Sequence, residues 1–361
     1  MKDVFEIRIN GQKFSLWESA NYTRSLDDMY GGFNFVTSNK PKNYPVKRGD
    51  AIQILINGIA VLTGFVFTIE SSGSINANMV SITGSDKTRD IADSSLPDNA
   101  KNSSGNVSLK SLCDKVIKGL GLDIKVIDRT GGISNFKSSE SEYGDSVSNA
   151  FSYLDSFARK KTVFLITDGN GDLVLWKPEN DRADDRIIHE FASNNNNVLT
   201  WRGVLSDNQR FNKYIVRSQD NASFDDDADY EEPGNDRKGQ AVDSEIRAGR
   251  YLEIMAEQSM NNKECLNRAK EEANLRRAKS KMYECTVQGA SQKTGKLWNI
   301  GQYVQVKDDV VPLRGLFIIS KVSMTQDIAG GTITALTMSL PDAYTGVDTI
   351  NKQTERKASI G

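Results

Sequence analysis

The stretch AIQILINGIAVLTGFVF, residues 51–67, alternates apolar and polar side chains on both sides of Asn57-Gly58. Such alternation is typical of a β-strand with one buried face, and Asn-Gly supplies the positive φ angles of a tight type I′ turn. The stretch therefore predicts a β-hairpin. It is also the most apolar region of the chain, but its polar interruptions argue against a membrane-spanning segment.

The flanking sequence predicts more short strands. Residues 5–17 form a second candidate hairpin around Asn10-Gly11, and further strands are expected at residues 22–26, 33–37 and 78–84. So many short strands in one segment favour a closed structure, because closure leaves no exposed sheet edge. We therefore predict a small β-barrel domain over residues 1–95.

The spacing of apolar residues becomes helical in the next segment. Two apolar stripes predict two helices, each followed by strands at residues 123–128 and 162–176; the stripes are Leu109, Leu112, Cys113, Val116, Ile117 and Leu120, and then Val147, Phe151, Leu154, Phe157 and Ala158. We expect a compact α+β middle domain over residues 96–192. Its two helix-then-strand units are consistent with a diverged duplication.

The C-terminal part returns to strands. Residues 193–222 and 282–345 are predicted to form a second small β-barrel, in which the strand at 210–220 joins the strands that follow residue 282. Residues 223–281 are expected to be an insertion with an acidic loop at 225–232 and a helix, and residues 346–361 a polar tail. The predicted fold class is mainly β with α+β parts.

The helix of this insertion has a small apolar face. Asn261 can cap its N-terminus together with Glu264, three residues later. Cys265, Leu266, Ala269 and Ala273 recur at helical spacing, which predicts close packing against a sheet. The spacing also predicts two ion pairs along the helix, Glu264–Arg268 and Glu272–Arg276.

The same helix carries a local positive charge, with seven basic and three acidic residues between positions 261 and 281. The favoured interpretation is a solvated helix whose charge lies near the acidic loop. A second hypothesis is contact with a partner or another subunit through Arg268, Arg276, Arg277 and Lys279. Nucleic-acid binding is disfavoured, because no aromatic residues are interleaved and the formal net charge of the chain is only -2.

No constellation of residues predicts catalysis. The single histidine, His189, has acidic neighbours in sequence, but no GxSxG motif accompanies it, and a strand-end histidine is the simpler interpretation. Residues 168–179 partly match a calcium loop, yet Leu173 stands where the loop needs glycine, so a hairpin turn is favoured. The Arg48-Gly49-Asp50 tripeptide is explained by a turn before a strand. We predict a non-enzyme with no metal and no cofactor.

The three cysteines, Cys113, Cys265 and Cys285, are far apart and form no CxxC motif. This pattern argues against a disulfide framework and fits synthesis in a reducing cytosol. The N-terminal residues show no signal-peptide pattern.

Several stretches in series resemble the baseplate hub proteins of Mu-like phages. They are PVKRGDAIQILINGIAVLTGFV (45–66), TGSDKTRDIADSS (83–95), GDSVSNAFSYLDSFARKKTVFLITDGNGDLVL (144–175), EANLRRAKSKMYECTVQG (272–289), GKLWNIGQYVQVKDD (295–309) and GGTITALTMSLPDAY (330–344). The resemblance covers nearly the whole chain in the same order, although no single motif marks a chemical activity.

This resemblance implies the baseplate hub fold, related to the hub of T-even phages, and a homotrimer with two β-barrels in each chain. Such a ring would join the six-fold tail tube to the three-fold central spike and surround a channel for the tape-measure protein and DNA, with DNA present only in passage. The expected location is the baseplate of the virion tail, assembled in the host cytoplasm without membrane insertion. The alternative function is a cell-wall-degrading or carbohydrate-binding tail enzyme, for which Glu140 and Glu142 are the residues to test.

Overall fold

The computed structural model describes residues 3–37, 45–75, 77–101, 106–136, 149–190, 193–218, 237–256, 260–310 and 313–345. The chain divides into two compact units, residues 1–202 with 284–338 and residues 203–283 with 339–361. Within the described ranges, no helix has the length and apolar character needed to cross a membrane.

The two predicted Asn-Gly hairpins are present in the first unit. Asn10 and Asn57 have φ angles of 49° and 52°, and the glycines after them have 79° and 81°, as a type I′ turn requires. The hairpins and three more strands build a β-rich block, which consists of β1 (Phe5–Ile9), β2 (Gln12–Phe14), β3 (Ser19–Ser25), β4 (Gly32–Thr37), β5 (Ala51–Ile56), β6 (Ile59–Ser74) and β7 (Ala77–Asp86).

This block continues into the C-terminal strands as one sheet, in the order β12-β16-β19-β18-β3-β4-β7-β6-β5-β1-β2. The added strands are β12 (Thr200–Leu205), β16 (Lys281–Gln288), β18 (Arg314–Asp327) and β19 (Gly331–Ser339), with β17 (Tyr303–Asp308) beside β18 and β11 (Ile187–His189) beside β17. The joint is the antiparallel pairing of β18 with β3, which runs from Lys321 opposite Ser25 to Asp327 opposite Ser19.

The mainly β prediction is confirmed, but the two closed barrels are not. Among the described residues, no pairing closes the path between its end strands, β12 and β2. The β3–β18 pairing gives both blocks a hydrogen-bonded neighbour at that joint, so these two strands need no closure to protect their edges.

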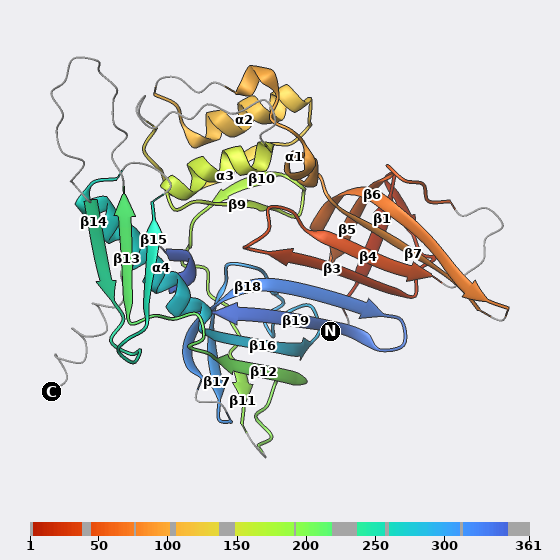
Figure 1. Cartoon of the computed structure of the whole chain (residues 1–361). Helices are drawn as coiled ribbons and strands as arrows, with labels where there is room; N and C mark the ends of the chain where they lie inside the picture. The colour runs from red at the N-terminus through yellow and green to blue at the C-terminus, as the bar shows by residue number, and fades with distance from the viewer. Residues whose placement is uncertain are drawn as a thin grey trace. The chain divides into compact units, whose positions relative to one another are not determined.

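The middle segment has the predicted helix-then-strand order. The elements are α1 (Arg89–Asp93), a short 3-10 turn η1 (Asp98–Ala100), α2 (Leu109–Leu120), β8 (Val126–Arg129), α3 (Ala150–Lys160), β9 (Phe164–Thr167) and β10 (Leu173–Trp176). β8 runs parallel to β10, and β9 pairs with β10 as an antiparallel hairpin. α2 and α3 pack over this sheet and share its apolar core (Figure 1). Gly121 ends α2 with a φ angle of 71°, as an αL cap requires.

The second unit holds a smaller sheet covered by a helix. Its strands, in the order β14-β13-β15, are β14 (Arg237–Val242), β13 (Lys213–Ser218) and β15 (Tyr251–Met255). The helix α4 (Asn262–Lys279) packs on β13 and β14, and α5 (Asp342–Thr345) contacts α4 (Figure 1).

This pairing corrects one strand assignment. The strand at residues 213–218 was expected to pair with the strands after residue 282, but it lies between β14 and β15 instead. Alternation predicts that a strand has a buried face, but it does not predict which strand lies beside it. The helical insertion as predicted is not confirmed, because residues 223–281 also supply two strands of this sheet. The five-part domain division stays a prediction.

Candidate interaction surfaces

The helix α4 is anchored at its N-terminus by the predicted capping box. The Asn261 side chain accepts a hydrogen bond from the Glu264 amide at 3.0 Å, and the Glu264 carboxylate accepts one from the Asn261 amide at 2.8 Å. These two bonds satisfy backbone donors that the first helical turn leaves without partners. They fix the start of the helix beside the sheet.

The predicted small face of α4 is buried in the core of the second unit. Cys265, Ala269 and Ala273 are almost fully buried against Tyr214 and Val216 of β13. Leu266, the fourth predicted residue of this face, is half-buried. The prediction of a helix pressed onto β-structure is confirmed.

The three arginines of α4 pair within their own chain. Arg268 and Arg276 both bond to Glu272, at 3.0 and 2.6 Å, and Arg277 lies 3.4 Å from a carboxylate oxygen of Glu245. The Glu272–Arg276 pair was predicted. The Glu264–Arg268 pair was wrong, because Glu264 caps the helix and Arg268 turns to Glu272.

Contact with another subunit through Arg268, Arg276, Arg277 and Lys279 stays a prediction, because pairs within one chain do not test it. Arg277 is buried, whereas Lys279 is exposed. The acidic segment 225–232, which was expected to lie near the helix, falls outside the described residues.

A charge network around the buried Arg210 lies beside α4, and the sequence did not reveal it. The Arg210 guanidinium, only 4 % exposed, donates to Asp243 and Glu245, both at 2.7 Å, and to Asp207 at 3.0 Å. Burial alone would raise the pKa of Glu245, but the hydrogen bond from Arg210 and nearby basic groups hold that pKa below its ordinary value. The network therefore joins the loop before β13 to the loop after β14.

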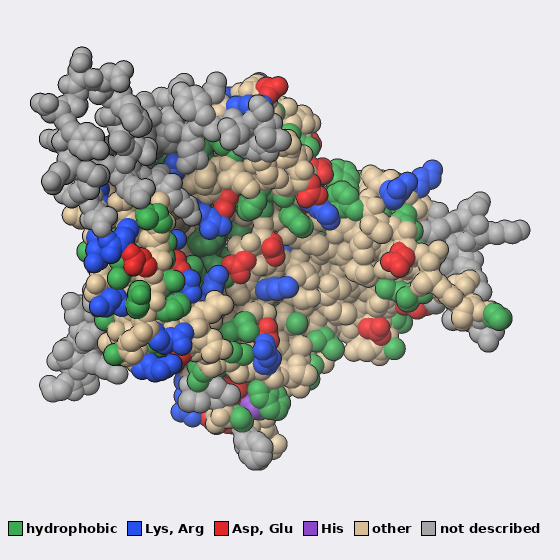
Figure 2. Space-filling model, in the orientation of Figure 1, with side chains coloured by type: hydrophobic (Ala, Val, Ile, Leu, Met, Phe, Trp, Pro, Cys, Tyr) green, Lys and Arg blue, Asp and Glu red, His purple; other side chains and the backbone are tan. Residues whose placement is uncertain are grey.

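His189 is a structural residue of a strand end, as predicted. Its ring is 3 % exposed, its Nδ1 lies 3.1 Å from a carboxylate oxygen of Asp308 and its face stacks on Trp201 at 3.6 Å. Figure 2 shows the histidine, in purple, beside hydrophobic side chains. The acids near it in sequence bond elsewhere, Asp184 to Thr294 and Glu190 to Lys307.

The glycine-rich segment 168–172 forms the predicted hairpin turn. Asp168 accepts hydrogen bonds from the amides of Asn170 and Asp172 at 2.8 and 3.0 Å. A β-carbon at Gly169 would lie 1.9 Å from the carbonyl oxygen of Ala60, so the turn packs directly on β6. In the described ranges, no group of three acidic, histidine or cysteine residues could hold a metal ion.

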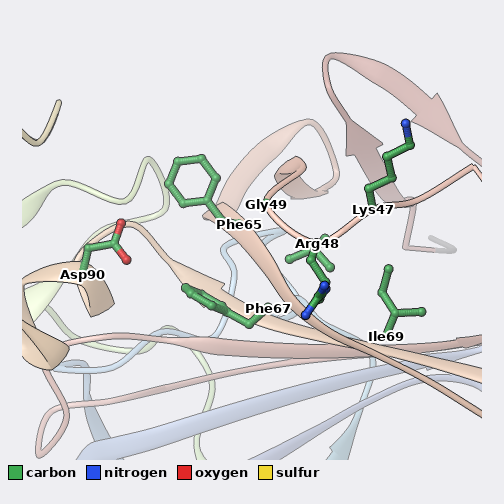
Figure 3. A pocket seen from close by; sticks show the side chains of 8 residues that line it. Lys47, Arg48, Gly49, Phe65, Phe67, Ile69 and Asp90 are labelled. Atoms are coloured by element: carbon green, nitrogen blue, oxygen red, sulfur yellow. The ribbon is translucent and has the colours of Figure 1, made fainter.

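The Arg48-Gly49-Asp50 tripeptide lies in a turn before β5, as predicted, with Gly49 at a φ angle of 84°. Beside it is an open hollow of about 900 Å³ that Figure 3 shows from close by. Its apolar lining comes from β6, through Phe65, Phe67 and Ile69, and Lys47 and Asp90 lie at its sides. The two acidic residues named for cell-wall cleavage, Glu140 and Glu142, lie outside the described residues.

One face of the large sheet carries a row of uncharged polar side chains. Cross-strand pairing places Thr325, Asn21, Asn34, Thr83 and Thr68 side by side on β18, β3, β4, β7 and β6. Asn21 bonds to the Thr325 hydroxyl at 2.9 Å, and all five side chains are half-buried or exposed. We call this row the polar band. It presents hydroxyl and amide groups without a fixed charge.

Comparison with known proteins agrees with this geometry. Residues 4–86 match the family model described as the Mu phage baseplate assembly protein GpP-like, N-terminal. Over 352 residues, the chain is 24 % identical to baseplate hub protein gp44 of Escherichia phage Mu, covering 95 % of this chain and 89 % of that protein. The chain resembles the baseplate hub proteins of Mu-like phages.

Two solved structures extend the resemblance to the fold. The 43 kDa tail protein of prophage MuSo2 from Shewanella oneidensis is 28 % identical, with a TM-score of 0.82 over 94 % of this chain and 99 % of that one. The tail protein from Neisseria meningitidis MC58 is 18 % identical, with a TM-score of 0.80 over 96 % and 99 %. The hub resemblance predicted from the sequence is therefore confirmed, and both of these solved structures are named as tail proteins.

Proposed function

We propose that this chain is a structural baseplate hub of a contractile phage tail, which forms a trimeric ring between the six-fold tail tube and the three-fold central spike. The similarity to a Mu baseplate hub protein over 95 % of the chain supports the hub assignment. Two β-rich blocks joined at β3 and β18 support the ring, because three such chains would present six blocks around one axis.

The observation that carries the channel role is the polar band. It spans five neighbouring strands, and every member is threonine or asparagine. A passage for a tape-measure protein and then for DNA has to avoid holding either of them, and a row of positive side chains would bind the DNA phosphates. We assign this face of the sheet to the channel.

The partners that follow are further copies of this chain, the central spike protein, the tail tube and other baseplate proteins. The location is the virion tail, with assembly in the host cytoplasm. The two-barrel domain division and the subunit contacts of Arg268, Arg276, Arg277 and Lys279 belong to this proposal.

Light scattering on the purified chain, alone and mixed with its spike protein, tests the ring. We expect a particle of three chains, alone or with the spike. A chain that stays monomeric and binds neither the spike protein nor the tube protein would overturn the proposal. Turnover of peptidoglycan by the pure protein, abolished by Glu140→Gln or Glu142→Gln, would favour the enzyme alternative instead.

A second experiment tests the channel role. Asn34→Lys adds a charge to the polar band, and Lys13→Ala changes an exposed residue of β2 as a control. We expect both variants to form the native particle, and only Asn34→Lys to lower the DNA delivery of phage assembled with it. Equal delivery by the two variants would contradict a channel-facing polar band.

A further inference from the structure

Several strand edges of the large sheet have a partner on one side only in the described part of the chain, and two of them, on β12 and β6, carry side chains that complement each other. β12 is the last strand of the path, with β16 on one side only. β6 pairs with β5 only as far as Phe65, so from Thr68 to Ser74 it has β7 on one side and no described strand on the other. A row of unpaired backbone N–H and C=O groups is a template for another strand.

The two edges present matching side chains on the partly exposed face of the sheet. On β6, Thr68 and Glu70 lie opposite Thr83 and Ser81, so they share the face of the polar band. On β12, Thr200 and Arg202 lie with Thr286 and Glu284 of β16, and these two alternate with the buried Cys285. Exposed Arg202 and exposed Glu70 therefore supply opposite charges on this face.

The other face of each edge is apolar. On β12, Leu199 and Trp201 are 49 % and 46 % exposed, which is unusual for large apolar side chains. On β6, Phe67 and Ile69 line the open hollow beside the edge (Figure 3). One face of Trp201 stacks on His189, and its exposed part can pack on the apolar side chains that line part of the hollow at the other edge.

We propose that β12 of one copy of this chain adds to the β6 edge of the next copy, with Leu199 and Trp201 directed to the hollow at Phe67 and Ile69 and Arg202 near Glu70. The contact is head to tail, since it joins two different edges, and such a contact gives a closed ring of three when the rotation between neighbouring copies is a third of a turn. It places Thr200 and Arg202 of β12 next to the β6 end of the polar band. This inference rests on the proposed ring and names the strands that form it.

Two variants, each with one of the two strand edges blocked, test the pairing. Leu199→Lys places a charge on the β12 edge, and Ile69→Lys places one on the β6 edge; neither side chain is fully buried, so we expect both variants to fold. Ile328→Lys, at a residue that is 67 % exposed in the turn after β18, is the matched control. Thermal unfolding of each variant confirms that it is folded.

Native mass spectrometry of the full chain gives the readout. Each edge variant alone should be a monomer, whereas a mixture of the two should give a dimer and no trimer, because one intact β12 edge then meets one intact β6 edge. The control should remain a trimer. Edge variants that still form trimers, or a mixture that stays monomeric, would overturn this pairing and leave the ring itself standing. A native chain that is monomeric under every condition would instead overturn the proposed function.

A charge exchange adds a second test. Glu70→Arg should weaken the trimer about tenfold through repulsion with Arg202. Combining it with Arg202→Glu should restore part of that loss, although Arg202 also pairs with Glu284 of its own chain at 2.9 Å. Absence of any rescue would contradict the proximity of these two side chains.

Discussion

A β-carbon at Gly239 would lie 2.0 Å from the backbone nitrogen of Leu266, so β14 and α4 touch backbone to backbone at this point. Gly239→Ala should lower the free energy of unfolding by about 2 kcal/mol or more, because neither the strand nor the helix can yield without disturbing the core between them. Urea denaturation measures the loss. Gly330→Ala, where the nearest atom would lie 3.6 Å away, is the control and should change little.

The network around buried Arg210 predicts that removing this one positive charge lowers the stability of the fold strongly. Arg210→Met removes the cation that bonds to Asp243, whose side chain is 4 % exposed, and leaves that carboxylate buried without its partner. We expect a loss of about 3–5 kcal/mol of stability. The exposed pair of Arg8 with Glu6 provides the comparison, and Arg8→Met should cost no more than about 1 kcal/mol. Similar losses in the two variants would contradict the network.

Asp86 predicts a pH dependence of stability. Burial raises the pKa of Asp86 to about 6, against the hydrogen bonds from Thr88 and the Gly31 amide that lower it. A carboxyl whose folded pKa is raised holds its proton more tightly in the folded state, so its contribution to stability is full below the ordinary pKa of 3.8 and disappears as pH rises through about 6. The positive charge of Arg24 also lowers the pKa of Asp86, but less than these hydrogen bonds do.

Asp86→Asn removes this titration. Between about pH 5 and about pH 7, the natural chain should lose about 1 kcal/mol more stability than the variant. Urea denaturation at both pH values measures the difference, and Asp28→Asn, at an exposed position, should leave the natural slope unchanged. Identical slopes for all three proteins would show that Asp86 does not titrate in this range.

The three cysteines should resist thiol reagents in the folded protein. Burial raises the pKa of Cys285 to about 12 and also raises the pKa of Cys113 and Cys265 above the ordinary value. Since the thiolate is the reactive form, Ellman's reagent should label almost none of them in the native state and all three in denaturant. Rapid native labelling of Cys265 would show that α4 detaches from its sheet.

Local patterns predicted local structure well. The helical stripe from Leu109 and the Asn-Gly pairs fixed α2 and both hairpins, because periodicity and turn chemistry act over a few residues. β14 was missed, since a glycine inside RKGQAV weakens the strand pattern. That glycine is Gly239, which the close approach of α4 requires.

Long-range partners could not be predicted in the same way. The strand at 213–218 was recognised, but its pairing with β14 and β15 was not, because one alternating strand fits many sheets. Arg210 meets Asp243 across 33 residues, and no spacing rule connects them. The polar band likewise joins five strands, so its residues show no common pattern in the sequence.

The β3–β18 joint has a consequence for how the chain is made. The Asn21 amide bonds to the Ser323 hydroxyl at 2.8 Å across 302 positions of sequence. After β3 leaves the ribosome, almost the entire chain must therefore be synthesised before β3 can pair with β18. Contacts between residues so far apart in sequence slow folding. Until β18 pairs with β3, the unpaired edge of β3 can pair with strands of other nascent chains. Premature termination before residue 314 should then yield aggregates rather than a soluble N-terminal fragment.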